Sequence, residues 1–478
     1  MLTTLLLLTA GCDRRPDTGA VVVSAIGPAP TGLLRDPLPP PARLLVDSTA
    51  QGLVRFDAAG QIEPGLAERW IVIDQGTSYI FRLREAQWAD GSPVTAEQVS
   101  TILRRRMSLR GSGPLAPFLT AVDEIVVMTP QVIEVRLRHP RPDLLKLFAQ
   151  PELAIARRRP TIGSGPFRIS GVQQGSVALR PAFDPNMADP EDQREAVPEE
   201  DVRLIGERAA RAIVRFVQRR ADLVTGGSFA DWPLLATVRI APADLRIDPA
   251  AGLFGLAIVS REGFLGDALN RGALAQAIDR GAVTSTVAPA WEGTDRILPD
   301  TLDSARPPAV PGWTLLDQAQ RQAGAAARVA NWTGGPVRLR IAMPAGPGGT
   351  LLYAQIAASL RRIGVGADRV AIDADADLRL VDAVAPYDSA RWYLATACQP
   401  CGAAATAKLD EARQAPTMAD RAARIAEADV LIVDDVPFIP IARPLRWSLV
   451  APRLSQWQAN TRAWHPLNRL RSDPNSAP

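Results

Sequence analysis

Hydrophobic and polar positions change their period between residues 60 and 103, and each pattern predicts an element. The run at 70–73, Trp-Ile-Val-Ile, is continuously apolar and predicts a buried strand. Asp-Gln-Gly at 74–76 then predicts a hairpin turn. The next stretch alternates, which predicts a half-buried strand whose inner face is formed by Tyr79, Phe81 and Leu83.

A helix is predicted shortly after this hairpin. Thr95 is followed three residues later by Gln98, a spacing typical of a capping box at a helix N-terminus. The apolar positions that follow lie on one helical face and are Val99, Ile102 and Leu103.

The second half of the chain carries a βαβ pattern. Apolar positions alternate at 337–343, recur at helical spacing at 352–363, and resume a strand pattern at 370–372. This order predicts a parallel strand pair with a helix packed on the sheet. Upstream, the near-continuous apolar run at 253–259 predicts a strand buried on both faces. We therefore expect the α/β fold class.

The stretch between residues 60 and 99 resembles one protein family through a motif of matching spacing. That family carries P-x-L-A-x-x-W, then Y-x-F-x-L-R, then W-x-D-G-x-P-V-T-A-x-D-V. The matching residues here are Pro64, Leu66, Ala67, Trp70, Tyr79, Phe81, Leu83, Arg84, Trp88, Asp90, Gly91, Pro93, Val94, Thr95, Ala96 and Val99, with Gln98 in place of the usual Asp. The family is the extracellular solute-binding proteins of family 5, the peptide, nickel and opine binders of ABC importers. These are core, turn and cap positions, so the motif indicates a fold and supplies no chemistry.

The resemblance implies a two-lobed periplasmic-binding-protein fold of type II, with mixed sheets, flanking helices and an extra domain. We expect the first lobe to be discontinuous and the extra domain to be inserted in it. The expected bounds are 43–58, 163–258 and 440–478 for the first lobe, 59–162 for the extra domain and 259–439 for the second lobe.

The N-terminal segment 1–12, MLTTLLLLTAGC, resembles the end of a bacterial lipoprotein signal, with lipidation of Cys12. An ordinary secretory signal, or no signal, are the alternatives, because the segment lacks a basic start and has Thr9 in place of the usual Leu. Residues 13–42 are rich in Pro and Gly, which predicts a tether with no helix. The first core strand is then expected at 43–46.

Composition indicates a globular protein without a nucleic-acid partner. The 478 residues are 47% hydrophobic and 22% charged, enough to build a core in more than one domain. The net charge is only +3, and the arginine runs at 104–106 and 157–159 are short and lack interleaved aromatic residues. Nucleic-acid binding needs a sustained basic surface. No apolar run reaches the roughly 18 residues of a membrane-spanning helix.

Few residues point to covalent or metal chemistry. Cys398 and Cys401 form a C-x-x-C motif, which can be a redox pair, half a zinc site or a small disulfide loop. His139 and His465 are the only histidines, too few to complete a zinc site, so we expect a disulfide and neither metal nor cofactor. Neither histidine lies in a hydrolase motif and no G-x-S-x-G occurs, which argues against an enzyme.

Candidate ligand contacts lie in two stretches that combine aromatic and polar residues, as a binding cleft requires. The loop at 226–232 contains Phe229 and Trp232, and the stretch at 386–394 contains Tyr387 and Asp388. Ordinary core packing is the alternative role for the tryptophans.

Three further residues enter through the resemblance. Trp392 resembles the family's cleft tryptophan, and Leu394 stands in the place of the Asp that neutralises the α-amine of a bound peptide. Asp388 could substitute for that Asp. Ser48 lies in a segment that resembles the start of the family's first lobe, and it completes the candidate set.

The sequence therefore predicts the solute-binding component of an ABC importer, which closes on a small ligand and delivers it to a membrane permease. We expect a monomer in the bacterial periplasm, held at the membrane by a lipid anchor. The alternatives are a sensor module of the same fold, and a ligand other than a peptide, such as an opine, a nickel chelate or a sugar. The missing Asp predicts weak binding of tri- to pentapeptides.

Overall fold

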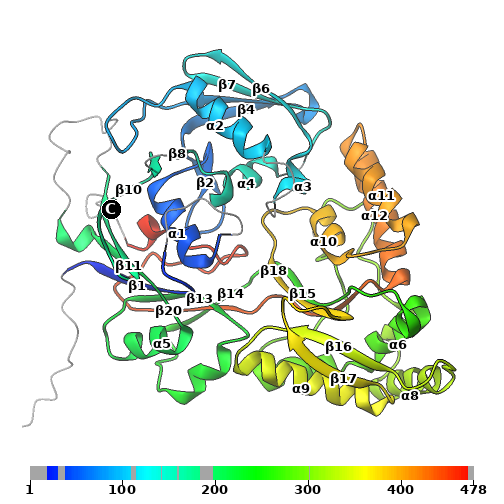
Figure 1. The fold of residues 1–478 in the computed structure, drawn as a ribbon. Helices are drawn as coiled ribbons and strands as arrows, with labels where there is room; N and C mark the ends of the chain where they lie inside the picture. The colour runs from blue at the N-terminus through cyan, green and yellow to red at the C-terminus, as the bar shows by residue number, and fades with distance from the viewer. Residues whose placement is uncertain are drawn as a thin grey trace, which may run out of the picture.

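The computed structural model of the protein describes residues 19–30, 38–108, 115–141, 143–158, 161–182, 197–300 and 302–471. Three bodies make up the fold, each around its own main sheet (Figure 1). We refer to them as the first lobe, with seven strands, the second lobe, with five strands, and the extra domain, with four strands. The predicted two-lobed α/β architecture is confirmed.

The first lobe is built around a strand close to the N-terminus. In order across its sheet the strands are β10 (Phe167–Gln173), β11 (Ser176–Pro181), β12 (Val202–Glu207), β1 (Val21–Ile26), β13 (Leu223–Ser228), β20 (Arg446–Val450) and β14 (Leu245–Asp248). β1 is parallel to β12 and β13, and the outer pairs are antiparallel. Helices α1 (Pro40–Thr49) and α5 (Ala209–Val217) pack their apolar faces into separate clusters of this lobe.

This lobe contradicts two predictions for the N-terminal region. β1 lies within the stretch 13–42 that we expected to be a tether, and residues 43–46 belong to α1, where we expected a strand. Three successive valines give β1 its strand propensity, and it pairs with partners nearly two hundred residues away. Pro40 and Pro41 occupy the first turn of α1, where a missing backbone N–H is tolerated. The prolines therefore mark a helix start.

The second lobe contains the predicted βαβ unit. Its strands, in order across the sheet, are β17 (Gly366–Ala371), β16 (Arg338–Met343), β18 (Leu378–Val384), β15 (Gly252–Ile258) and β19 (Phe438–Ala442). β16 is parallel to β17, and α9 (Pro347–Arg362) connects them, which confirms that prediction. β15 is buried at every position, as expected from its apolar run.

The other helices of the second lobe form two groups. One group shares an apolar cluster with the five-stranded sheet of the second lobe. It contains α6 (Ala268–Ala277), α7 (Arg280–Val287) and α8 (Gln318–Ala330). The other group packs toward the extra domain and contains α10 (Ala390–Ala397), α11 (Ala403–Gln414) and α12 (Met418–Asp435) (Figure 1).

Two short connections join the lobes. Residues 249–251 lead from β14 to β15, and residues 443–445 lead from β19 to β20. The predicted boundaries after residues 258 and 439 are therefore wrong by one strand each, since β15 and β19 pair with each other in the second lobe. A strand that is apolar on both faces fits the centre of either sheet, so its pattern could not assign it.

The extra domain confirms the predicted hairpin and helix. Its antiparallel sheet has the order β4 (Ala67–Ile73), β5 (Ser78–Leu83), β7 (Val132–Leu137) and β6 (Val122–Thr129), covered by α2 (Ala96–Ser108). The shorter elements around it are α3 (Ala116–Leu119), α4 (Leu144–Phe148) and the pairs β2 (Val54–Phe56) with β3 (Ile62–Pro64) and β8 (Ala156–Arg158) with β9 (Thr161–Gly163).

Gln98 has two roles at the start of α2. Its side-chain oxygen accepts a hydrogen bond from the Thr95 backbone N–H, and the Gln98 N–H donates to the Thr95 hydroxyl, both at 3.4 Å, so the capping box is confirmed. The same oxygen accepts a hydrogen bond from the buried Trp88 indole N–H at 2.8 Å.

The run at 70–73 forms a strand, as predicted, but it is not buried. β4 is an edge strand of its sheet, and Ile71 is 57% exposed. Within the described residues, no helix combines the length and the apolar character that crossing a membrane requires.

Candidate ligand-binding site

A cavity of about 380 Å³ lies where the two lobes meet. Strands from both sheets form its walls: Thr225 and Gly226 in the middle of β13 in the first lobe, and residues 382–386 at the end of β18 in the second. Helix α1, Arg446 of β20 and the C-terminal segment 462–465 add to the lining, together with Phe56, Gln150 and Pro151 of the extra domain. This volume lies in the range of small-molecule sites. Because the walls belong to bodies joined by two short connections, a hinge motion would close them on a ligand.

A larger cavity of about 470 Å³ is not lined by both lobes. Its lining comes from the first lobe and the extra domain, and includes Arg55, Trp88 and Ser164. No lining residue belongs to the second lobe, so closure of the lobes would not enclose its contents. We therefore take the 380 Å³ cavity, called the interlobe cavity below, as the candidate site.

Ion pairs hold the basic groups on the walls of the interlobe cavity. Arg446 on β20 contacts Asp382 on β18 at 2.8 Å, so this pair links the two lobes. Burial raises the pKa of Asp382, and the Arg446 guanidinium opposes that rise. Arg43 on α1 lies 3.3 Å from Glu152 and 5.1 Å from the centre of the Trp464 ring, a cation–π arrangement.

His465 anchors the C-terminal segment of the cavity wall. Its Nε2 lies 3.1 Å from Oδ2 of Asp248, and both side chains are buried. The other oxygen of Asp248 accepts a hydrogen bond from the backbone N–H of Asn460 at 3.0 Å. These contacts place Trp464 and Arg462 against the cavity, so His465 has a structural role here.

Asp388 lies at a junction of all three bodies. It accepts a hydrogen bond from Lys146 of the extra domain at 2.5 Å and forms an ion pair with Arg462 of the first lobe. The Arg462 side chain is 3% exposed, and burial lowers its pKa to about 10. Asp388 is therefore neutralised by two protein cations, which leaves it poorly suited to receive the amine of a ligand.

Trp392 does not line the interlobe cavity, so its expected role as a cleft tryptophan stays a prediction without support from this site. Trp392 is 5% exposed within α10, with its ring 4.9 Å from that of Tyr393 in an edge contact. Leu394 on the same helix is fully buried. Tyr387 is buried as well and lines a different cavity, between α10 and the extra domain. Residues 382–386 stand on the cavity wall that we expected Trp392 to occupy.

The remaining candidates also lie outside the cavity lining. Phe229 is 1% exposed and packs against Phe254 with ring centres 4.9 Å apart. Trp232 is partly buried and contacts apolar clusters of both lobes. Ser48 is buried within α1. Core packing, the alternative role for such aromatic residues, describes Phe229 and Trp392.

Comparison with known proteins assigns the family. The sequence model of the bacterial extracellular solute-binding proteins, family 5 middle region, matches residues 61–395. The chain belongs to this family. The "Probable deoxycholate-binding periplasmic protein YgiS" of Escherichia coli is 43% identical over 70 residues, a stretch that covers only 14% of this chain and 13% of that relative. Family 5 proteins are binding proteins.

Solved structures share the fold over nearly the whole chain. Haemophilus influenzae OppA in complex with RPPGFSPFR has a TM-score of 0.79 at 15% identity, covering 94% of this chain and 98% of that chain. The Escherichia coli murein tripeptide binding protein MppA has the same score at 17% identity, with the same coverage. At these identities the likeness shows the fold alone.

For this family 5 protein, sequence reasoning missed the residues that line the cavity. Arg462 and Trp464 reach it from an irregular C-terminal segment, and Arg446 and Thr225 reach it from β20 and β13. Trp464 stands out in the sequence as an aromatic residue among polar ones, but its local pattern does not predict that it lies opposite β18 in the cavity. The contacts that bring them together span more than sixty residues.

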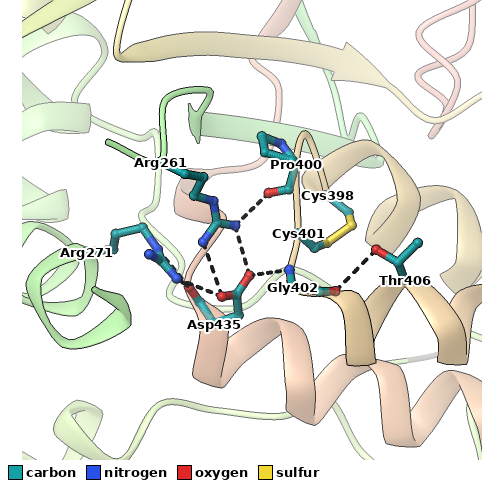
Figure 2. The surroundings of a disulfide bond; sticks show 8 residues. All are labelled: Arg261, Arg271, Cys398, Pro400, Cys401, Gly402, Thr406 and Asp435. Carbon is teal, nitrogen blue, oxygen red and sulfur yellow. Dashed lines mark hydrogen bonds and ion pairs between the residues drawn. A yellow bond between two sulfur atoms is a disulfide. The ribbon is translucent and has the colours of Figure 1, made fainter. Parts of the chain in front are cut away.

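The predicted disulfide between Cys398 and Cys401 is present, in the loop between α10 and α11 (Figure 2). Asp435, at the end of α12, braces this loop by accepting a hydrogen bond from the Gly402 N–H at 2.9 Å and by pairing with Arg261 and Arg271 at 2.8 and 2.7 Å. Arg261 also donates to the Pro400 carbonyl at 2.6 Å. Among the described residues no His, Cys, Asp and Glu side chains gather into a metal-binding group. Cys12 lies outside the described residues.

Proposed function

We propose that this protein is the extracytoplasmic solute-binding component of an ABC importer, acting as a monomer. The interlobe cavity carries the proposal, because strands of both lobes line it and two three-residue connections allow the lobes to close. A small ligand is captured there and delivered to a membrane permease. The family membership and the fold shared with peptide-binding structures support this role.

The ligand is not a peptide held by its α-amine at Asp388. Lys146 and Arg462 already neutralise that carboxylate, and Leu394, the other candidate position, is apolar and buried. A ligand amine would have to displace a protein cation, which costs the protein an ion pair for each one gained. These contacts favour a non-peptide metabolite, the alternative ligand class of the sequence analysis, for the interlobe cavity.

Ligand release from the purified protein tests this proposal. The protein is isolated without added ligand, its intact mass is measured under native conditions, and the small molecules freed on unfolding are identified by mass spectrometry. We expect one small molecule per chain, and we expect the same compound to raise the melting temperature when it is added back.

A matched pair of variants ties that result to the cavity. Ala383 lines it on β18, so Ala383→Phe fills part of its volume and should abolish ligand retention. Ala404→Phe makes the same change at an exposed position of α11 and should leave retention intact. If neither native mass nor a broad metabolite panel reveals a bound compound, the binding proposal is refuted.

We also propose that Cys12 is lipidated and anchors the protein in the periplasm. Only eight residues separate Cys12 from the first residue of β1, and they can span at most about 29 Å. The folded body would therefore lie close to the membrane that carries the permease. Palmitate labelling of the wild-type protein, absent in Cys12→Ala together with its membrane association, checks this; labelling of the variant would contradict it.

A further inference from the structure

Four arginines from two bodies converge on a narrow cavity that shares no lining residue with the interlobe cavity. Arg141 comes from the extra domain, just before α4. Arg391, Arg413 and Arg421 come from α10, α11 and α12 of the second lobe. We call this group the arginine cluster. The Arg141 guanidinium donates to the Arg413 backbone carbonyl at 2.6 Å, so the two bodies are in direct contact here.

The positive charge of the arginine cluster is only partly compensated by the protein. Arg421 pairs with Asp303 at 3.1 Å, and Arg413 pairs with Asp410 at 3.3 Å. Among the described residues, no carboxylate forms an ion pair with Arg141 or Arg391. Both donate to backbone carbonyls, and Arg391 also lies 6.0 Å from the centre of the Phe118 ring. Two guanidinium charges therefore face the same cavity without an anion of the protein.

The surroundings make this excess charge costly. Phe118 and Tyr387 close the cavity with an edge contact at 5.7 Å, and Leu144 and Leu147 add apolar surface. Burial, followed by repulsion from Arg421 and Arg391, lowers the pKa of Arg141 to about 10. Burial raises the pKa of Tyr387 to about 12, so its hydroxyl stays protonated and can donate a hydrogen bond.

We propose that the arginine cluster is a binding site for a small monovalent anion, either a halide ion or a carboxylate group. Such an anion would compensate the charge of Arg141 and Arg391 and hold the extra domain to the second lobe. The cavity volume of about 10 Å³ is close to the minimum for one water molecule, so an anion enters only with a small outward movement of the lining side chains. The smallest anions need the least movement, which favours a halide or a single carboxylate over phosphate or sulfate. This site stands apart from the proposed function, because an inorganic anion binds here whatever the transported ligand is.

Thermal unfolding in different sodium salts at constant ionic strength tests the proposal. Fluoride is the reference anion, since its strong hydration disfavours entry into a cavity with apolar walls. On general solvent effects, replacing fluoride by chloride or bromide should lower the melting temperature, because more weakly hydrated anions favour burial less. A bound anion reverses that sign. We expect a rise of several degrees that saturates with chloride, bromide or formate.

Charge-neutral variants separate the site from a general salt effect. Arg141→Gln and Arg391→Gln should each abolish the rise, and either one suffices if the other does not fold. Arg138→Gln removes the same charge from an exposed position of the extra domain, where the side chain pairs with Asp123 and is 62% exposed, and should keep the rise. Bromide located by anomalous diffraction should lie between Arg141 and Arg391.

The salts also distinguish the source of the anion. A rise with halides supports an inorganic ion as the occupant, and a rise with formate alone supports the carboxylate of a larger molecule. A melting temperature that follows the general salt order in the wild-type protein overturns the proposal. A rise that persists in both Arg141→Gln and Arg391→Gln overturns it as well.

Discussion

Replacing Asp388 with asparagine removes a carboxylate that joins all three bodies of the fold. Its partners are Lys146 on α4 of the extra domain and Arg462 in the C-terminal segment of the first lobe. Both ion pairs of Asp388 run from the second lobe to another body, so the substitution removes no ion pair from within a body. We therefore expect Asp388→Asn to weaken the contact between the three bodies while leaving each lobe folded.

The size of the effect follows from exposure. Two unit charges at 4 Å attract by about 4 kcal/mol at an effective dielectric constant near 20. The Asp388 side chain is 36% exposed, so solvent screening reduces this toward the roughly 1 kcal/mol of partly exposed pairs. Arg462 is 3% exposed and would keep an uncompensated buried charge, which adds to the loss. We expect a total of about 2–3 kcal/mol, or roughly a 30- to 150-fold shift toward open forms.

Small-angle X-ray scattering of the ligand-free protein measures this shift as an increase in the radius of gyration. Urea unfolding followed by circular dichroism should show that the secondary structure persists. The control is Asp368→Asn, which breaks the pair with Arg338 on the surface of the second lobe, where Arg338 is 71% exposed. An unchanged radius of gyration in Asp388→Asn, or an equal change in the control, would refute the reasoning.

Three further predictions concern ligand choice, pH and the disulfide loop. Tri- to pentapeptides should bind poorly, since no free carboxylate is available for their α-amine at Asp388, and binding at micromolar affinity or tighter by calorimetry would contradict this. Burial raises the pKa of Asp429 to about 6, so the folded state binds this proton more tightly than the unfolded state does. The stability that this group contributes is full below pH 3.8 and is lost as the pH rises through about 6. Asp429→Asn should therefore be more stable than the wild-type protein at pH 7.5, by up to about 3 kcal/mol, with the difference vanishing near pH 4; a less stable variant at pH 7.5 would speak against this. Removing both cysteines as Cys398→Ser with Cys401→Ser should cost at most about 2 kcal/mol, because the closed loop is short. Asp435→Ala should cost about 3–5 kcal/mol, because it leaves two arginines without their partner, one of them 2% exposed; denaturant midpoints that reverse this order would show that the disulfide, and not the ion pairs, holds the loop.

Local patterns in the sequence were sufficient for much of the fold. The alternation at Tyr79, Phe81 and Leu83 predicted a strand that the structure contains, and the Thr95–Gln98 spacing predicted the cap of α2. The C-x-x-C spacing favoured the disulfide that forms. Each of these features depends on residues within a few positions of one another, so the chain carries them before it folds. The family motif is built from the same kind of core, turn and cap positions.

Only the tertiary structure decided where the bodies begin and what lines the site. Val21–Ile26 looked like part of a linker because its partners in β12 and β13 lie nearly two hundred residues away. Trp392 matched a cleft motif, yet α10 turns it into the core, while Trp464 and Arg462 reach the interlobe cavity from an irregular tail. The period and spacing of apolar residues predict which side chains lie on the same face of a helix or strand. Which partner it meets depends on pairings across hundreds of residues, and the charges and walls of a binding site exist only once those pairings have formed.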